Sequence, residues 1–124
     1  MNTSAVIGIF FDQNDNILTI KNSRGIDIPG GHAESGETVK QTIIREAREE
    51  AGAVIDDIQL IKKIQTKNGV YLGKSMVFVM GKVISFDKRK ANLMTITDFL
   101  EAYRQNKSLM KIILRKVKKD YEGK

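Results

Sequence analysis

The first third of the chain alternates short apolar runs with turn residues, a pattern typical of β-strands joined by tight connections. Residues 4–11 and 17–20 are rich in β-branched and aromatic side chains, which favour strands. Residues 12–16, between them, consist mainly of Asp and Asn, which form turns. We therefore expect a β-hairpin, followed by a short third strand over residues 26–28 that ends at Pro29, the one proline in the sequence.

The pattern changes to a helical period over residues 38–51. Thr38 and Gln41 have the spacing of a capping box, and Gly52 follows as a stop signal. At about 100° per residue, the apolar side chains of this segment share one stripe that we expect to face a core. They are Val39, Ile43, Ile44, Ala47 and Ala51.

After Gly52 the composition returns to that of β-strands. Residues 53–66 predict one long or bulged strand, and residues 75–84 predict a second long strand. Asn68-Gly69 between them is a hairpin-turn signal. We expect residues 85–94 to form a loop.

The C-terminal part predicts two helices. Thr95 or Thr97 can cap the first, which contains Phe99, Leu100 and Tyr103. The second is expected over about residues 108–118 with Ser108 as its cap. Its apolar side chains fall on one stripe, which favours a helix docked on the core; they are Leu109, Met110, Ile113, Leu114 and Val117.

Composition adds limits to this picture. A chain of 124 residues with 41% hydrophobic side chains fits a single globular domain, residues 1–124. Cysteine is absent, which excludes disulfide scaffolds, thiolate metal sites and cysteine nucleophiles. No apolar run reaches the roughly 20 residues of a membrane span, and the N-terminus lacks the basic segment of a secretory signal. We therefore expect a cytoplasmic protein without a membrane partner.

The net charge of +6 lies entirely at the C-terminal end. Residues 1–103 carry 13 basic and 13 acidic side chains, whereas residues 104–124 carry eight basic and two acidic ones. A basic end can attract polyanions such as nucleic acid. The alternative is the solvated face of a core-docked helix, and both interpretations stay open at this point.

Three carboxylates, on Glu46, Glu49 and Glu50, fall on one arc of about 100° beside the apolar stripe. Like charges three and four residues apart repel on a helix, so the cluster favours a compensating cation. Oxygen-only ligands suit Mg²⁺ or Mn²⁺ better than Zn²⁺. With the Gly30-Gly31 loop, where a ligand can approach the backbone closely, the pattern indicates a metal-dependent phosphoryl-transfer or hydrolase site. A surface acidic helix is the alternative.

The spacing of these residues resembles the Nudix box. Gly31, five residues, Glu37 and seven residues precede the run 45–53, REAREEAGA. This run fits the family pattern R-E-U-x-E-E-x-G-U, in which U is a bulky aliphatic residue. Ala47 and Ala53 occupy the two U positions, which is a mild departure. The motif covers 23 residues, and the order of predicted elements resembles the Nudix domain over most of the chain.

The resemblance implies an α/β fold, an α/β/α sandwich with a mixed sheet, and an enzyme that uses Mg²⁺ or Mn²⁺. Nudix proteins hydrolyse a pyrophosphate bond in a nucleoside diphosphate derivative such as a nucleoside triphosphate, a nucleotide sugar or a dinucleoside polyphosphate. It also implies that Arg45 orients the glutamates and that Glu37 ties the loop to the helix. The implied metal ligands are Glu46, Glu49, Glu50 and the carbonyl of Gly30, with Glu46 as a candidate base.

Weaker candidates lie outside the motif. Lys21 and Arg24 follow the second predicted strand, where the family often places a basic residue near phosphate. Asp87 is the one carboxylate in the 85–94 segment, where some relatives carry an additional base. Two alternatives to a small-nucleotide hydrolase remain: a non-catalytic nucleotide- or RNA-binding regulatory module, and an enzyme acting on RNA 5′ ends. The sequence is compatible with a monomer or a homodimer.

Overall fold

A mixed β-sheet forms the centre of the molecule. The computed structural model describes residues 5–65 and 75–122, with side chains described to residue 118 at the C-terminal end. The strands are β1 (Ala5–Phe11), β2 (Ile17–Asn22), β3 (Gly25–Asp27), β4 (Gly30–His32), β5 (Val54–Gln65), β6 (Ser75–Ser85) and β7 (Ala91–Met94). The helices are α1 (Val39–Ala51), α2 (Ile96–Ala102) and α3 (Lys107–Glu122).

Strand β1 lies in the middle of this sheet. It runs parallel to β6 along its whole length, and it pairs antiparallel with β2 at the hairpin and with β4 at its other end. The sheet order is β3-β2-β1-β6-β5, with β4 beside β1 and β7 beside β2. The parallel β1–β6 pair makes the sheet mixed, as expected.

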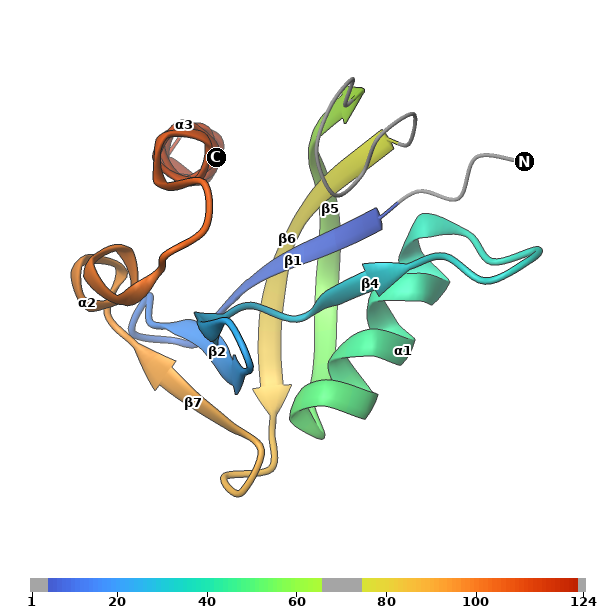
Figure 1. Ribbon diagram of the computed structural model, residues 1–124, viewed down its shortest axis with the longest axis horizontal. Helices are drawn as coiled ribbons and strands as arrows, with labels where there is room; N and C mark the ends of the chain where they lie inside the picture. Colours follow the sequence, from blue (N-terminus) through green and yellow to red (C-terminus); the bar gives the residue numbers. More distant parts are fainter. Residues whose placement is uncertain (1–4, 66–74, 123–124) are drawn as a thin grey trace.

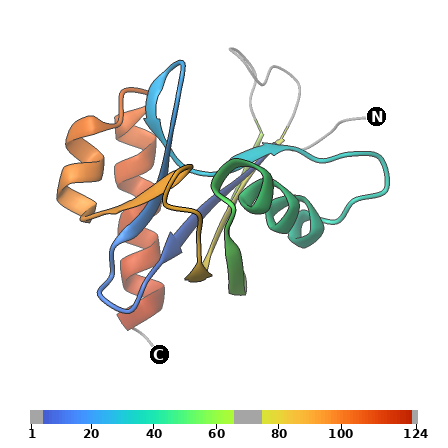
Figure 2. The same ribbon diagram turned by 90° about the horizontal axis from the view of Figure 1, so that it is seen from below.

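Helices cover both faces of the sheet, with α1 on one side and α2 and α3 on the other (Figures 1 and 2). Strand alternation supplies both cores: Val6 and Phe10 of β1 pack on the α1 side, whereas Ile9 and Phe11 pack on the α2–α3 side. The expected α/β/α sandwich is therefore confirmed. No helix in the described part of the chain is long and apolar enough to cross a membrane.

Helix α1 has the predicted ends. The Thr38–Gln41 capping box is formed, and Gly52 ends the helix in the left-handed conformation with φ of 57°. The predicted apolar stripe is wrong at one position, because Ile44 is 39% exposed. Thr42 is buried in its place, and its hydroxyl donates to the carbonyl of Thr38 and to Glu37. Local hydrogen bonding thus allows a polar residue to occupy the inner face.

Two predictions for the C-terminal third need correction. The segment 85–94 is not all loop, since β7 adds to the edge of β2 through pairs from Ile17↔Met94 to Ile20↔Ala91. Asn106, not Ser108, caps α3, because its side-chain oxygen accepts from the N–H of Leu109 at 3.0 Å.

The remaining C-terminal predictions are confirmed or lie outside the described residues. Thr95 caps α2 as expected. Met110, Ile113, Leu114 and Val117 of α3 are buried, and Leu109 packs against the same core. The Asn68-Gly69 turn lies outside the described residues.

Candidate active site

The loop that ends in β4 meets the acidic face of α1. The N–H of Gly30 donates a 2.8 Å hydrogen bond to Oε1 of Glu50. One residue further on, a Cβ built on Gly31 would lie 2.5 Å from the carboxyl carbon of Glu46. Only glycine leaves room there for the carboxylate in its present position. Two of the three predicted carboxylates are therefore brought against the predicted glycine loop.

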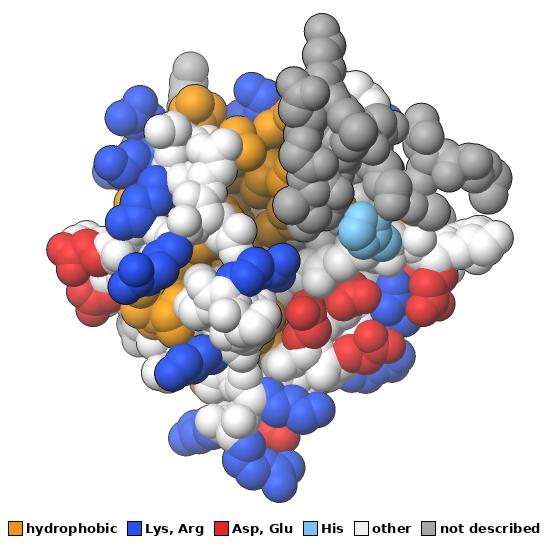
Figure 3. Space-filling view, in the orientation of Figure 1, with side chains coloured by type: hydrophobic (Ala, Val, Ile, Leu, Met, Phe, Trp, Pro, Cys, Tyr) orange, Lys and Arg blue, Asp and Glu red, His pale blue; other side chains and the backbone are white. Residues whose placement is uncertain are grey.

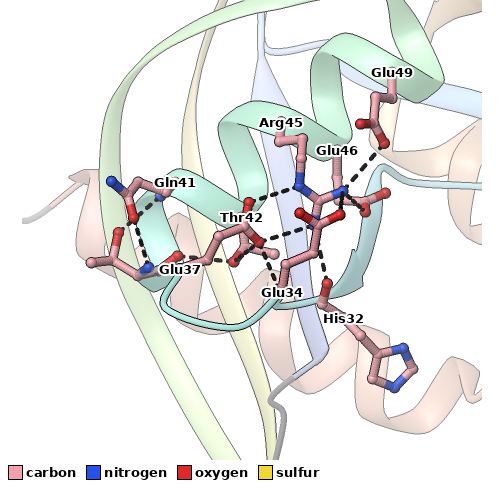
Figure 4. Close-up of polar contacts among 9 residues, drawn as sticks. His32, Glu34, Glu37, Gln41, Thr42, Arg45, Glu46 and Glu49 are labelled. Carbon is pink, nitrogen blue, oxygen red and sulfur yellow. Dashed lines mark hydrogen bonds and ion pairs between the residues drawn. The ribbon is translucent and has the colours of Figure 1, made fainter.

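Arg45 is the centre of the polar contacts on this face of α1 (Figure 4). Its Nε and Nη2 donate to the two oxygens of Glu37 at 2.7 and 3.0 Å, which is a bidentate pair. Its Nη1 donates to Glu46 at 2.7 Å and to Glu49 at 3.2 Å. The predicted roles of Arg45 and Glu37 fit these contacts, because one guanidinium binds Glu37, Glu46 and Glu49 together.

The same network fixes the loop before the helix. Nη2 of Arg45 donates to the carbonyl of His32 at 3.1 Å, and the N–H of Glu34 donates to Glu37 at 2.8 Å. The hydrogen bonds from Arg45 and from this backbone N–H lower the pKa of Glu37 to about 2. Glu37 is therefore fully ionised near neutral pH and acts as the tie between loop and helix.

Glu50 is in a different environment from Glu37. It is half-buried, and burial raises its pKa to about 7, against the opposing effect of the Gly30 hydrogen bond. The neighbouring charges of Glu46 and Asp27 contribute to this increase. A carboxyl group that gains or loses a proton near pH 7 is suited to proton transfer.

A cleft of about 630 Å³ opens next to this group, between the sheet and the start of α3. One group of its lining residues, called the polar end below, surrounds Glu50 and consists of Arg24, Asp27, Gly30, Gly31, His32 and Glu50. Most of the remaining lining is apolar, including Ile64, Met76, Tyr103, Leu109 and Met110, and the segment before α3 adds Gln105 and Asn106. Figure 3 shows acidic side chains gathered beside His32 and basic side chains on the side where α3 lies. The cleft thus combines a polar group of residues around Glu50 with a mainly apolar remainder.

The weaker sequence candidates separate in the structure. Arg24 lines the cleft, whereas Lys21 is exposed on β2 and is not among the lining residues. Asp87 lies at the C-terminal end of α1, where its N–H donates to the carbonyl of Ala51. Arg89 forms an ion pair with the Asp87 carboxylate at 3.0 Å and lowers its pKa. The structure therefore brings Arg24 to the site and leaves Asp87 engaged elsewhere.

The residues expected to hold a metal ion have suitable chemistry but are engaged with protein groups. In residues 5–65 and 75–122, no three Asp, Glu or His side chains are arranged as a metal-ion site. Glu46 and Glu49 instead contact Arg45, and Glu50 contacts Gly30. All the donors are hard oxygens, and Glu46 and Glu50 both lie against the glycine loop. This donor set fits Mg²⁺ or Mn²⁺.

Several cleft residues were not predicted from the sequence. Asp27, Tyr103, Gln105 and Asn106 belong to this group. Asp27 could have been noticed in the sequence, because it is a charged residue between two apolar ones, Ile26 and Ile28. Tyr103 to Asn106 carried no comparable signal, because their position depends on how α2 and α3 pack against the sheet.

The sequence is similar to one protein family and to a curated member of known activity. A family model described as NUDIX domain matches residues 1–98. A curated ADP-ribose pyrophosphatase from Methanocaldococcus jannaschii is 38% identical over 72 residues, which cover 54% of this chain and 38% of that protein. The matched region thus spans well under half of the relative's length.

Solved structures share the fold at lower identity. The C. elegans Ap4A hydrolase superposes with a TM-score of 0.74 at 18% identity, covering 98% of this chain and 99% of that one. A NUDIX hydrolase from Nitrosomonas europaea gives a TM-score of 0.70 at 21% identity, covering 100% and 91% of the two chains. At these identities the likeness shows the fold alone.

Proposed function

The chain belongs to the Nudix family, and from this membership we propose that it is a metal-dependent pyrophosphohydrolase. Its substrate would be a nucleoside diphosphate derivative: a nucleoside triphosphate, a nucleotide sugar or a dinucleoside polyphosphate. One observation carries the proposal: Glu46 and Glu50 both lie against the Gly30-Gly31 loop, and this loop and Glu50 line a nucleotide-sized cleft.

Mg²⁺ or Mn²⁺ would be held by the carboxylates of Glu46, Glu49 and Glu50 and by the carbonyl of Gly30. When bound, the metal would neutralise charge on the phosphate oxygens and lower the pKa of a water ligand. The known relative that acts on ADP-ribose supports a nucleotide sugar as one substrate class.

The protein's own side chains would mainly hold the glutamates in place and accept a proton from the attacking water. Arg45 holds Glu46 and Glu49 through hydrogen bonds, and Glu37 holds Arg45. Two glutamates are candidates to take the proton of the attacking water. Resemblance to one branch of the family favours Glu46, whereas the pKa of Glu50, raised by burial to about 7, favours Glu50.

The two ends of the cleft would receive different parts of the substrate. Its polar end, with Arg24 beside Glu50, suits the pyrophosphate, while the apolar wall of Ile64, Met76 and Leu109 suits a nucleobase or a sugar. Lys21, which is exposed outside the cleft lining, is the weaker candidate for a phosphate contact.

The test is a panel of nucleoside di- and triphosphates, nucleotide sugars, dinucleoside polyphosphates and 5′-triphosphorylated RNA, each assayed with Mg²⁺, with Mn²⁺ and with chelator. Released phosphate or pyrophosphate, or a nucleoside monophosphate product, is expected with metal and not with chelator. Turnover that is unchanged by chelator, or no turnover of any substrate by folded protein with metal, would overturn the proposal. If the folded protein turns over no substrate but binds nucleotides tightly, a non-catalytic regulatory module would be favoured.

A second candidate substrate is the 5′ end of RNA. Lys107, Lys111, Arg115 and Lys118 fall within about 80° on the surface of α3, and all four are exposed. Among the described residues, none of them forms an ion pair with an acidic side chain. This row begins next to Asn106, which lines the cleft, so a polynucleotide held by its 5′ end there could follow α3.

A further inference from the structure

A buried carboxylate, that of Asp27, lies at the polar end of the cleft. Asp27 ends β3, is only 8% exposed and lines the cleft together with Glu50. Its Oδ1 accepts from the N–H of Ile28 at 2.8 Å. Its Oδ2 accepts from the side-chain amide of Asn22 and from Nη2 of Arg24, both at 3.1 Å. A buried carboxylate needs such donors to offset its desolvation.

The guanidinium of Arg24, by contrast, is bound by Asp27 and is otherwise exposed to solvent. Its side chain is 57% exposed. Within residues 5–65 and 75–122, the Asp27 carboxylate is the one acceptor found for its guanidinium. Its backbone N–H donates to Oδ1 of Asn22 at 2.9 Å, which fixes the turn on which it sits. A guanidinium has five N–H donors in a planar fork, so most of them remain available to a ligand.

This arrangement connects to the candidate active site through the backbone. Ile28, which donates to Asp27, comes two residues before Gly30, and Gly30 donates to Glu50. Arg24, Asp27, Gly30 and Glu50 all line the same cleft. The positive charge of Arg24 also acts on Glu50, because it partly offsets the increase in the pKa of that carboxyl group. The guanidinium is therefore near the expected position of the pyrophosphate.

We infer that Asp27 is a positioning residue that holds the Arg24 guanidinium at the mouth of the cleft as a contact for a substrate phosphate. The inference rests on the proposed function, since it assigns a role toward the phosphates of that substrate. A fixed guanidinium offers a phosphate two parallel hydrogen bonds. A long side chain without its anchor would have to be ordered when the substrate binds, at a cost in affinity. Asp27 lowers that cost without contacting the phosphate.

A purely structural role for Asp27 predicts something different. In that case the carboxylate locks the β2–β3 turn and Arg24 is only a solvated partner of it. Removing Arg24 would then leave substrate binding unchanged, and removing Asp27 would lower thermal stability and all kinetic constants together. The two roles are therefore separated by the behaviour of Arg24 and by comparison of the single and double variants.

The experiment compares Asp27→Asn, Arg24→Gln, Arg24→Lys and the double variant Asp27→Asn/Arg24→Gln, using the best substrate from the panel above. The control is Arg89→Gln, which breaks an Asp–Arg pair of the same kind outside the cleft. We expect Asp27→Asn and Arg24→Gln each to raise KM about tenfold, the size of one lost charge-assisted contact, with a smaller change in kcat. The double variant should be no worse than the more impaired single one.

Direct binding supplies a second measurement. Inorganic pyrophosphate titrated by calorimetry in the presence of Mg²⁺ should bind more weakly to Arg24→Gln and Asp27→Asn, and Arg24→Lys should recover part of the loss. Unchanged KM and pyrophosphate affinity in Arg24→Gln would overturn the inference, and so would fully additive effects in the double variant. Because Arg24 is exposed, its variants test the inference even if Asp27→Asn fails to fold. Failure of wild type on every substrate would instead count against the proposed function.

Discussion

The amide of Gly30 donates a 2.8 Å hydrogen bond to the carboxylate of Glu50, which joins the glycine loop to the last turn of α1. The pairing of β4 with β1, including Ile7↔Gly30, holds the loop on the sheet. The sheet, loop and helix thus place this carboxylate at the polar end of the cleft. Three of the predictions below depend on this placement.

Loss of one carboxylate charge should remove activity without unfolding the protein. We expect Glu49→Gln and Glu50→Gln each to reduce kcat/KM by about 10²-fold or more, because a metal ligand is lost. Gln has a helix propensity close to that of Glu, so circular dichroism should show an intact helix. Wild-type turnover by the folded variants at saturating metal would show that the site is assigned to the wrong residues.

The raised pKa of Glu50 also predicts a stability effect. The folded state holds a proton to about pH 7, whereas the unfolded chain releases it near 4.5, so ionising Glu50 destabilises the fold as pH rises between these values. In chelator at pH 8, Glu50→Gln should be more stable than wild type by on the order of 1 kcal/mol, allowing for solvent screening at this half-buried site. At pH 4 the two should melt alike.

The same carboxylate makes metal stabilisation dependent on pH. Bound Mg²⁺ requires the ionised carboxylate, so the rise in melting temperature caused by Mg²⁺ should diminish as pH falls below 7. Glu50→Gln should show a smaller rise at every pH. Equal melting temperatures of wild type with Mg²⁺ and with chelator at pH 8 would contradict a metal site here.

Much of the helix α1 region could be predicted because its signals are local. The Thr38 cap and the Gly52 stop each depend on residues within a few positions of one another, and both are found in the structure. Ile44 was wrongly predicted to be buried, because a helical wheel gives the direction of a side chain but not whether the sheet extends far enough to cover it. The exposed position of Ile44 and the buried Thr42 depend on the neighbouring elements.

The cleft could not be predicted in the same way. It combines Arg24 of the β2–β3 turn, Glu50 of α1 and Asn106 before α3, and no local spacing relates these three residues. Strand β7 was missed for a similar reason, since its partner β2 lies some 70 positions earlier in the sequence and the pairing has no local pattern. Contacts between distant segments depend on the packing of the complete fold.

Gly31→Ala should damage the site while leaving the fold intact. The added Cβ would lie 2.5 Å from the carboxyl carbon of Glu46. Because that carboxylate is at the end of a flexible side chain, it can move aside and lose its place next to the loop. We expect kcat/KM to fall about 10-fold or more with little change in melting temperature. Ser35→Ala, in the connection between β4 and α1, is the control, and equal activity of both variants would show that the close approach is unimportant.

Arg45 and Glu37 should make the loop sensitive to acid. The pKa of Glu37 is lowered from 4.5 to about 2, so its contribution to stability is complete above pH 4.5 and is lost as pH falls toward 2. Glu37→Gln should therefore be less stable than wild type at pH 7, and the difference should shrink on acidification. Thermal melts at pH 7, 4 and 2.5 measure this; a difference that is constant with pH would exclude an ionic origin.

The two faces of α3 should respond in opposite ways to mutation. Met110, Ile113, Leu114 and Val117 are buried against the sheet, and each buried side chain of this size stabilises by about 1.5–3 kcal/mol. Deleting residues 108–124 should therefore unfold or aggregate the protein. By contrast, exposed lysines contribute little, so changing Lys111, Arg115 and Lys118 to Gln should leave the melting temperature and small-nucleotide hydrolysis nearly unchanged.

The same triple variant decides whether the basic face of α3 binds a polyanion. If this face is only exposed to solvent and binds no RNA, wild type and variant should hydrolyse 5′-triphosphorylated RNA at equal rates, and these rates should change little with salt. If it binds the RNA backbone, wild type should act on RNA much better at 50 mM than at 200 mM salt, because each phosphate contact releases a counterion. The variant should then lose that advantage and keep its activity on nucleoside triphosphates, which would place RNA ends ahead of free nucleotides as the substrate.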